Sequence, residues 1–138
     1  MDLVVKHLMD HGIRPSVQRV AIMRYLMEHR THPTVEDIYR DLHDEMPTLS
    51  KTTIYNTLSL LGEKDALSLL TIDSKNIHYD GDVSPHAHFL CRCCHRIFDV
   101  ALPLGLDSDG MMSVGFSIEH SHVYYDGVCN MCSGKGQE

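Results

Sequence analysis

Apolar residues in the first half of the chain recur every three or four positions, which predicts a series of short amphipathic helices. The first apolar set is followed by Gly12, a common helix stop, so we expect a helix over residues 2–11. Three further helices are expected, and each begins at a side chain that can accept hydrogen bonds from a helix N-terminus. These capping residues are Ser16, Thr34 and either Ser50 or Thr52.

Two β-prone runs follow the helices, at residues 67–72 and 76–80. The stretch between them begins Asp73-Ser-Lys, which has the chemistry of a tight turn. Several helices followed by a β-hairpin is the element order of a winged helix-turn-helix. The sequence therefore predicts such a domain, and with it binding to DNA, over residues 1–80.

The fourth expected helix has a small polar face opposite its apolar residues Ile54, Leu58 and Leu61. Hydroxyls, one amide, one aromatic ring and one lysine on this face can bond base edges and phosphates without bulk. The face is suited to the major groove of DNA, but an ordinary solvent-exposed helix would carry similar residues, and both interpretations stay open. Its members are Lys51, Thr52, Thr53, Tyr55, Asn56 and Ser59.

The net charge weighs against a nucleic-acid partner. The chain has 12 basic and 19 acidic residues and a formal charge of -7, whereas phosphate binding needs clustered Lys and Arg. Contacts with DNA would depend on a few well-placed cations, chiefly Arg14, Arg19, Arg24 and Lys51. The sequence has no apolar run of about 18 residues and no basic-then-apolar leader, so we expect a cytoplasmic protein with no membrane partner.

Five cysteines are an odd number for a disulfide framework, and their spacing indicates metal thiolates. Two Cys-x-x-Cys pairs supply the four thiols of a tetrahedral structural zinc site, and Cys93 is left over. His86 and His88 lie just before the first pair and, being two residues apart, share one face of a strand, so a second metal site is expected. The pairs are Cys91 with Cys94 and Cys129 with Cys132.

The segment between residues 100 and 116 is expected to hold only a short or broken helix, because Pro103, Gly105 and Gly110 interrupt it. Asp107–Gly110 has the composition of a calcium loop but lacks the later Glu, so a solvated turn is the preferred interpretation. Several other side chains are interpreted as surface residues: His7, His11, His29, His43, His95, Glu119, His120 and His122.

Four segments and the terminal cysteine pair, in this order, resemble the ferric uptake regulator family over about residues 3 to 132. The segments are Ile13–Arg19, His32–Tyr39, Ser50–Asn56 and His86–Cys94. Within the family, the chain looks most like the peroxide-responsive regulators. The features that point to this branch are Tyr55-Asn56 in the fourth helix, Asp80, and Asp99 where many relatives carry Glu.

The resemblance implies a homodimeric repressor with an α+β fold. It implies an N-terminal winged helix-turn-helix domain at residues 1–80, a hinge at 81–85, and a small C-terminal α/β dimerisation and metal-binding domain at 86–138. The implied partner is a double-stranded DNA operator. The residues expected to contact it are Arg14, Arg19, Lys51, Thr52, Thr53, Tyr55 and Asn56.

The resemblance also implies two metal sites. Structural Zn²⁺ would be bound by Cys91, Cys94, Cys129 and Cys132. A regulatory ion, Fe²⁺ or Mn²⁺ with Zn²⁺ as a further choice, would be bound by His32, Asp80, His86, His88 and Asp99. That ion would hold the two domains together across the hinge, and with Fe²⁺ bound, peroxide would oxidise His32 and His86 and release the DNA.

Three positions depart from the family pattern. His95 follows the first cysteine pair where relatives often have Gly, and it puts bulk at a turn. Ala87 and Ser121 occupy positions where relatives carry ligands of an additional site, so we expect no third metal.

Two other functions stay open. One is a repressor of the same fold that reports iron, zinc or manganese without peroxide chemistry. The other is a zinc-stapled protein-interaction module with no role on DNA. An enzyme is not expected, because the sequence offers no nucleophile and base apart from the metal donors.

Overall fold

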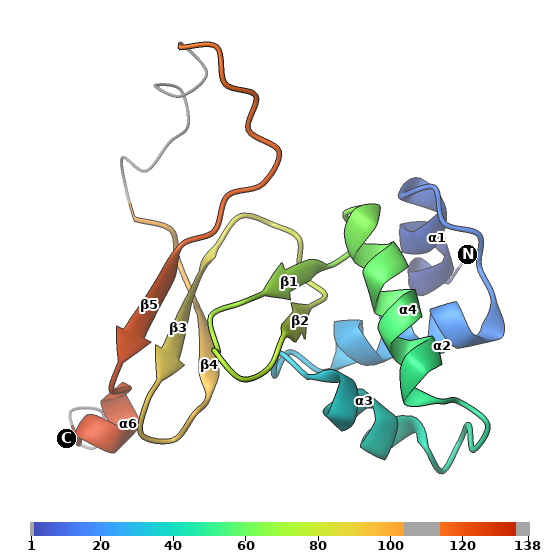
Figure 1. Ribbon diagram of the computed structural model, residues 1–138, viewed down its shortest axis with the longest axis horizontal. Helices are drawn as coiled ribbons and strands as arrows, with labels where there is room; N and C mark the ends of the chain where they lie inside the picture. Colours follow the sequence, from blue (N-terminus) through green and yellow to red (C-terminus); the bar gives the residue numbers. More distant parts are fainter. Residues whose placement is uncertain (1, 104–113, 135–138) are drawn as a thin grey trace. The chain divides into compact units, whose positions relative to one another are not determined.

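The computed structural model describes residues 2–103 and 114–134 (Figure 1). The chain divides into two compact units, residues 1–83 and residues 84–138, and each is described by itself. The turn expected at Asp107–Gly110 lies outside the described residues, as does most of the segment expected to hold a broken helix.

The first unit contains four helices followed by a β-hairpin, in the predicted order (Figure 1). The hairpin strands pair antiparallel, with Leu69 opposite Tyr79, and Asp73 accepts a hydrogen bond from the Lys75 backbone in the predicted turn. The elements are α1 (Leu3–Asp10), α2 (Val17–Glu28), α3 (Val35–Leu42), α4 (Lys51–Glu63), β1 (Ser68–Leu70) and β2 (His78–Asp80).

Polar side chains start the helices as predicted. The Ser16 hydroxyl accepts a backbone N–H of α2 at 3.2 Å, and Thr34 forms a reciprocal capping box with Asp37. Ser50, and not Thr52, caps α4. Each such cap contributes about 1 kcal/mol, because it satisfies a backbone donor that the helix leaves without a partner.

The helices and hairpin of the first unit share one apolar core. Tyr79 of β2 is 2% exposed and packs into this core, which fixes the hairpin against the helices. The chain then passes close to α2 at Gly81, where an added Cβ would lie 3.0 Å from the Leu26 carbonyl oxygen. Other fully buried members are Leu8, Ile22, Ile38, Ile54, Leu58 and Leu61.

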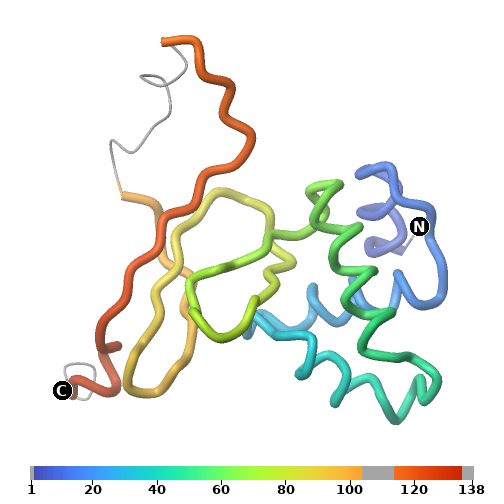
Figure 2. The backbone as a smooth tube through the Cα atoms, viewed as in Figure 1, coloured from blue at the N-terminus to red at the C-terminus, as the bar shows by residue number. Residues whose placement is uncertain are grey.

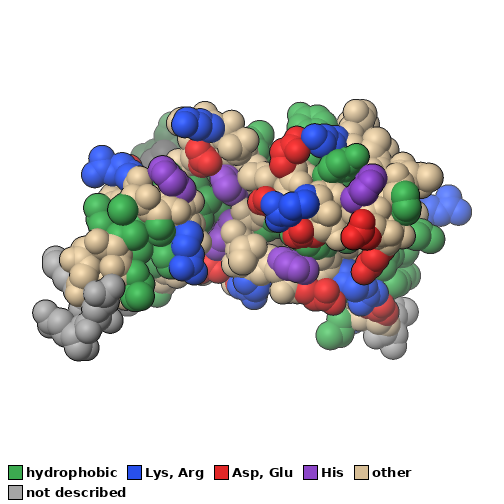
Figure 3. Space-filling model, turned by 90° about the horizontal axis from the view of Figure 1, so that it is seen from below, with side chains coloured by type: hydrophobic (Ala, Val, Ile, Leu, Met, Phe, Trp, Pro, Cys, Tyr) green, Lys and Arg blue, Asp and Glu red, His purple; other side chains and the backbone are tan. Residues whose placement is uncertain are grey.

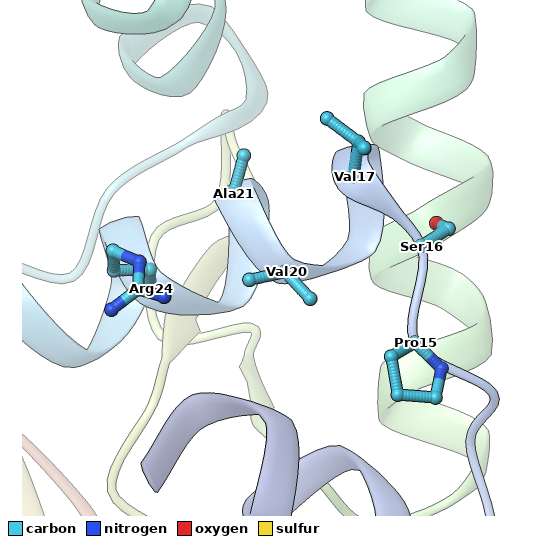
Figure 4. A pocket seen from close by; sticks show the side chains of 6 residues that line it. All are labelled: Pro15, Ser16, Val17, Val20, Ala21 and Arg24. Atoms are coloured by element: carbon cyan, nitrogen blue, oxygen red, sulfur yellow. The ribbon is translucent and has the colours of Figure 1, made fainter. Parts of the chain in front are cut away.

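α2 is apolar around most of its circumference. Its inner side carries core residues, whereas its outer side presents Val17, Val20 and Ala21 to a shallow hollow (Figure 4). Arg24 lies at one end of this hollow and forms an ion pair with Asp2. The outer side therefore combines an apolar surface with a neutralised charge.

In the described residues 84–103 and 114–134, the second unit contains a three-stranded sheet followed by one short helix. β3 lies in the centre, antiparallel to β4 and parallel to β5, and Figure 2 follows the chain through the β3–β4 hairpin. No helix in residues 2–103 or 114–134 is long and apolar enough to span a membrane. The elements are β3 (Ala87–Cys91), β4 (Ile97–Val100), β5 (Tyr124–Gly127) and α6 (Asn130–Ser133).

Candidate metal centres

The structure brings together the four paired thiols of the second unit. Cys91 ends β3, Cys94 follows in the next turn, and Cys129 and Cys132 lie at and within α6. All four Sγ atoms lie within 4.8 Å of one another, and those of Cys94 and Cys129 are 4.0 Å apart. A tetrahedral zinc ion with bonds of about 2.3 Å requires sulfur separations of about 3.8 Å, so these thiols fit zinc.

Backbone donors prepare Cys91 to act as a thiolate. Its Sγ accepts the N–H of Cys94 at 3.4 Å and that of Cys129 at 3.3 Å. These two hydrogen bonds lower the pKa of Cys91 to about 6, with the Cys94 donor as the largest cause. A hydrogen bond with Cys129 raises the pKa of Cys132, because the thiols share protons when no cation is bound. A metal ion would replace those shared protons.

The turn that follows β3 ends in an unusual backbone conformation. His95 has φ +64°, in the left-handed region that Gly adopts most easily, and its N–H bonds to the Cys91 carbonyl at 2.8 Å. This explains physically why Gly suits the position. Cys93 lies in the same turn and is exposed.

A buried imidazole and carboxylate meet in the first unit. His32 lies between α2 and α3 and Asp80 ends β2, and each is 3% exposed. Their Nε2 and Oδ2 atoms are 3.5 Å apart. The other Asp80 oxygen accepts the Asp82 N–H at 2.9 Å, which orients the carboxylate. Buried charge of this kind requires a proton or a cation nearby.

The His32 loop is held in place by the hairpin. The Tyr79 N–H donates to the Pro33 carbonyl at 2.9 Å, and His78 Nδ1 lies 2.7 Å from the His32 carbonyl oxygen. His78 Nε2 in turn contacts Asp73 at 2.9 Å and lowers the pKa of that carboxyl. No motif in the sequence marks His78 as a residue of this site. The signal in the sequence is its position two residues before the predicted ligand Asp80, in the same expected strand.

The second unit places Asp99 against two imidazoles. The antiparallel register sets Asp99 of β4 opposite His88 of β3. Asp99 Oδ1 lies 3.1 Å from His86 Nε2 and 3.3 Å from His88 Nε2, and the two imidazole centres are 4.4 Å apart. The three donors predicted for this unit are therefore adjacent.

The tautomer of His86 leaves this cluster able to hold a proton or a metal ion. His86 Nδ1 lies 2.6 Å from the Ser84 carbonyl oxygen, which only accepts, so Nδ1 carries the hydrogen. In neutral His86 the Nε2 lone pair then faces the Asp99 carboxylate at 3.1 Å. Two electron-pair donors at that distance attract only through a proton or a metal ion between them. The imidazole and carboxylate donors suit Fe²⁺, Mn²⁺ or Zn²⁺.

The residues predicted to contact DNA lie in the first unit. On α4, Lys51, Thr52, Tyr55 and Asn56 are exposed and share one side of the helix, while Thr53 is half-buried. The Arg19 guanidinium donates to the Arg14 carbonyl at 2.9 Å, which fixes the approach to α2. On the face seen in Figure 3, acidic and basic side chains are interleaved and form no continuous basic patch.

Lys51 is the cation best placed on that side of α4. Its ammonium group pairs with Glu36 at 2.9 Å and lies 5.1 Å from the centre of the Tyr39 ring. The Glu36 hydrogen bond raises the pKa of Lys51, so the charge is present but partly neutralised. Contact with a phosphate would therefore exchange one anionic partner for another.

Comparison with family models matches this chain to a known family. The ferric uptake regulator family model matches residues 10–126, which is most of the sequence. Curated relatives include the peroxide operon regulator of Bacillus subtilis (strain 168), 35% identical over 131 residues, with 93% of this chain and 90% of that protein covered. The peroxide-responsive repressor PerR of Staphylococcus aureus (strain Mu50 / ATCC 700699) is 32% identical over 133 residues, covering 95% and 90%.

Solved structures agree with these matches. The ferric uptake regulator Fur of Helicobacter pylori superimposes with a TM-score of 0.75 at 18% identity, covering 96% of this chain and 95% of that chain. PerR from Streptococcus pyogenes, described in terms of peroxide sensing and gene regulation, gives a TM-score of 0.52 at 29% identity, covering 94% and 90%. These likenesses confirm the predicted α+β fold class.

Proposed function

This chain belongs to the ferric uptake regulator family, and from that premise we propose that it is a metal-dependent DNA-binding repressor that senses peroxide through oxidation of its ligand histidines. The family and its curated relatives are transcriptional regulators and not enzymes, as the sequence predicted. The matches by themselves show a regulator of this family that is related to the peroxide regulators. Peroxide sensing by histidine oxidation depends on the metal-binding residues.

The observation that carries the proposal is the position of Asp99 between His86 and His88. Its oxygen lies within 3.3 Å of both Nε2 atoms, an arrangement that favours a bound cation. His32 and Asp80 form the complementary buried pair in the other unit. We propose that one regulatory ion, Fe²⁺ or Mn²⁺, takes donors from both sets.

An ion bound in this way would link the two units across a hinge at residues 81–85. Because it binds only when both donor sets face it, the ion shifts the population toward one arrangement of the units. That arrangement would set the α4 helices of a dimer against two operator half-sites. Loss of one ligand would relax the arrangement and release the DNA.

Histidine oxidation is the proposed signal. Bound Fe²⁺ would supply the reductant that converts peroxide to an oxidant able to add oxygen to an adjacent imidazole. His32 is held by its buried loop and His86 by its bond to the Ser84 carbonyl, so each presents Nε2 at a fixed position. An oxidised ring loses the basic nitrogen that binds the ion.

A homodimer is part of the same proposal. The described part of the second unit exposes several large apolar side chains. Exposed apolar residues on a small unit are typical of a surface that binds another chain. They are Leu102, Val114, Phe116, Tyr125, Val128 and Met131.

Anaerobic loading followed by peroxide tests the proposal. We would load the zinc-containing protein with Fe²⁺ or Mn²⁺, add peroxide, and analyse the peptides that contain His32 and His86 by mass spectrometry. The expected result is a gain of about one oxygen on either peptide in the Fe²⁺ sample only, together with release from a palindromic AT-rich site. The His43 peptide, which holds an exposed histidine outside both donor sets, serves as the internal control.

Other outcomes identify the alternatives. Unchanged His32 and His86 peptides with intact DNA binding would contradict peroxide sensing and favour a repressor that reports metal alone. Equal affinity for the palindrome and for random DNA over a range of salt concentrations would contradict a repressor altogether. An Asp99→Glu variant whose His32 and His86 peptides oxidise as fast as those of the parent would contradict the use of Asp99 as a mark of peroxide sensing.

A further inference from the structure

Two histidines lie one turn apart in the first unit, His7 in the last turn of α1 and His11 at its C-cap. Because they are four residues apart, their side chains lie on the same side of the helix end. Both are half-buried, and their ring centres are 4.4 Å apart. The sequence pattern alone suggested two surface histidines, whereas the structure pairs them.

Backbone carbonyls fix the tautomer of each ring. His7 Nε2 lies 2.7 Å from the Ala66 carbonyl oxygen, and His11 Nδ1 lies 2.8 Å from the His7 carbonyl oxygen. A carbonyl oxygen only accepts, so these nitrogens carry the hydrogens. The lone pairs of the neutral rings are therefore at His7 Nδ1 and His11 Nε2.

This is the arrangement found around bound metals. A metal-binding imidazole usually donates its second nitrogen to a carbonyl or carboxylate, which fixes the ring and leaves the other nitrogen to bind the ion. Here both rings are prepared in that way before any ion is present.

The ring separation indicates which ions fit. A metal–nitrogen bond of about 2.0 Å places a ring centre about 3.1 Å from the ion, so ring centres 4.4 Å apart correspond to an angle near 90° at the metal. Right angles between donors are typical of octahedral or square-planar coordination and not of tetrahedral zinc. Nitrogen donors in that geometry suit Ni²⁺ and Cu²⁺.

A carboxylate lies on the same turn. Asp10 forms an ion pair with Lys6 at 2.7 Å, and it is close enough to His7 and His11 for both to lower its pKa together with Lys6, which is the largest cause. The Asp10 carboxylate would therefore attract a cation bound by the two rings. Water would complete the coordination, because this face of α1 is open to solvent on the side of Asp10.

We propose that His7 and His11 form a metal site on α1 for a divalent ion with cis nitrogen donors, Ni²⁺ or Cu²⁺, separate from the two sites of the proposed function. The ion would clamp the last turn of α1 to its C-cap residue. Through the bond from His7 to Ala66, it would also stiffen the connection between α1 and the turn after α4. The site adds a second metal response to the DNA-binding unit.

His29 provides a matched control within the chain. Its Nδ1 also lies close to the carbonyl four residues earlier, at 2.9 Å from Tyr25, so it presents Nε2 much as His11 does. Its ring stacks on Tyr25 at 4.0 Å and not on a second imidazole. His29→Ala should therefore remove a histidine of the same local structure without affecting the proposed site.

Ni²⁺ is the probe, because thiols in the chain would reduce Cu²⁺. The full-length protein is first given two equivalents of Zn²⁺ for the thiol cluster and the proposed regulatory site. Ni²⁺ bound per chain is then counted by equilibrium dialysis, and paramagnetic broadening of backbone amide signals locates it. We expect the parent and His29→Ala to bind one more Ni²⁺ than His11→Ala, with broadening centred on α1 and Ala66.

A second variant guards against a folding defect. His7→Gln keeps a donor for the Ala66 carbonyl but removes the ring nitrogen, so it should fold and still lose the ion. Equal Ni²⁺ counts in the parent, His11→Ala and His7→Gln would overturn the proposal. Broadening centred on residues outside α1 and its neighbours would overturn it as well.

Discussion

Two histidines in this protein adopt a backbone conformation that favours Gly. His32 has φ +60° and His95 has φ +64°. A side chain in the left-handed region costs about 1–2 kcal/mol, because Cβ approaches the following carbonyl oxygen. His32 is buried beside a carboxylate, so its strain accompanies a proposed ligand role. His95 is exposed, and nothing in its contacts repays the strain in the same way.

Substitution of His95 tests this strain directly. We expect His95→Gly to stabilise the zinc-loaded second unit by about 0.5–1 kcal/mol, since Gly relieves the Cβ clash but adds freedom to the unfolded chain. His95→Val should destabilise it by about 1 kcal/mol, because a branched Cβ fits this region less well. Denaturant unfolding measures both changes.

Arg92→Gly is the matched control for His95, since Arg92 lies in the same turn and lacks a positive φ. Arg92→Gly should lower the free energy of unfolding by about 0.5–1 kcal/mol, because at this position Gly only adds conformational freedom to the unfolded chain. Equal losses for Gly at both positions would show that His95 is not strained.

Some residue roles could be predicted from the sequence and others could not. The caps Ser16 and Thr34 were predictable, because capping depends on the few residues next to them. The role of His78 was not predictable, because its two contacts lie 46 and 5 residues away and depend on how the hairpin packs. The pairing of His7 with Ala66 spans 59 residues and was missed for the same reason.

At the scale of elements, one hydrogen bond joins α2 to α3. The Tyr25 hydroxyl donates to Asp41 at 2.5 Å. Burial, followed by the Asp41 contact, raises the pKa of Tyr25. Hydrogen bonds from Arg40 and, second, from Tyr25 lower the pKa of Asp41. The bond therefore links a neutral phenol to a charged carboxylate across the helix pair.

Tyr25→Phe should lower the free energy of unfolding by about 1.5 kcal/mol near neutral pH, at the low end for bonds to charged groups, because Asp41 is partly solvated. Tyr39→Phe is the control, and it should change stability by less than about 0.5 kcal/mol. Denaturant unfolding followed by circular dichroism measures both. A loss for Tyr39→Phe as large as that for Tyr25→Phe would contradict a specific role for the bond.

The effect of Tyr25→Phe should depend on pH at both ends. The lowered pKa of Asp41 contributes stability above its unfolded value of 3.8, and that contribution is lost as the pH falls through the still lower folded value. The raised pKa of Tyr25 contributes stability below its unfolded value of 10.0, and that contribution is lost as the pH rises through the folded value. The cost of the substitution should therefore be largest between about pH 4 and 10 and shrink outside it.

Elements of the first unit followed the sequence pattern, because each helix has its own apolar period and cap. The second unit was harder to predict. Its strands β3 and β4 are short, and the pairing of His88 with Asp99 depends on a turn whose shape is set by Cys91, Cys94 and His95. The family resemblance implied that His88 and Asp99 bind the same ion. The periodicity of apolar residues does not predict that these two side chains are close together.

At the scale of the whole molecule, the two units depend on different forces. The first has a core of buried apolar side chains, whereas among the described residues of the second (84–103 and 114–134) the fully buried ones are few and include Cys91 and Ala87. A small unit with so little apolar burial requires a covalent or metal crosslink to stay folded. The thiol cluster joins β3 to α6 and can provide that crosslink when zinc is bound.

Removal of zinc should therefore unfold the second unit and leave the first folded. Cys132→Ser should lose the bound zinc and the dimer, because an apparent binding energy of about 10–16 kcal/mol for structural zinc is coupled to folding. Most helical circular dichroism should remain, since α1, α2, α3 and α4 all belong to the first unit. Cys93→Ser, in the same turn but outside the cluster, should keep zinc and dimer. Loss of the helical signal together with zinc would show that the first unit needs the second in order to fold.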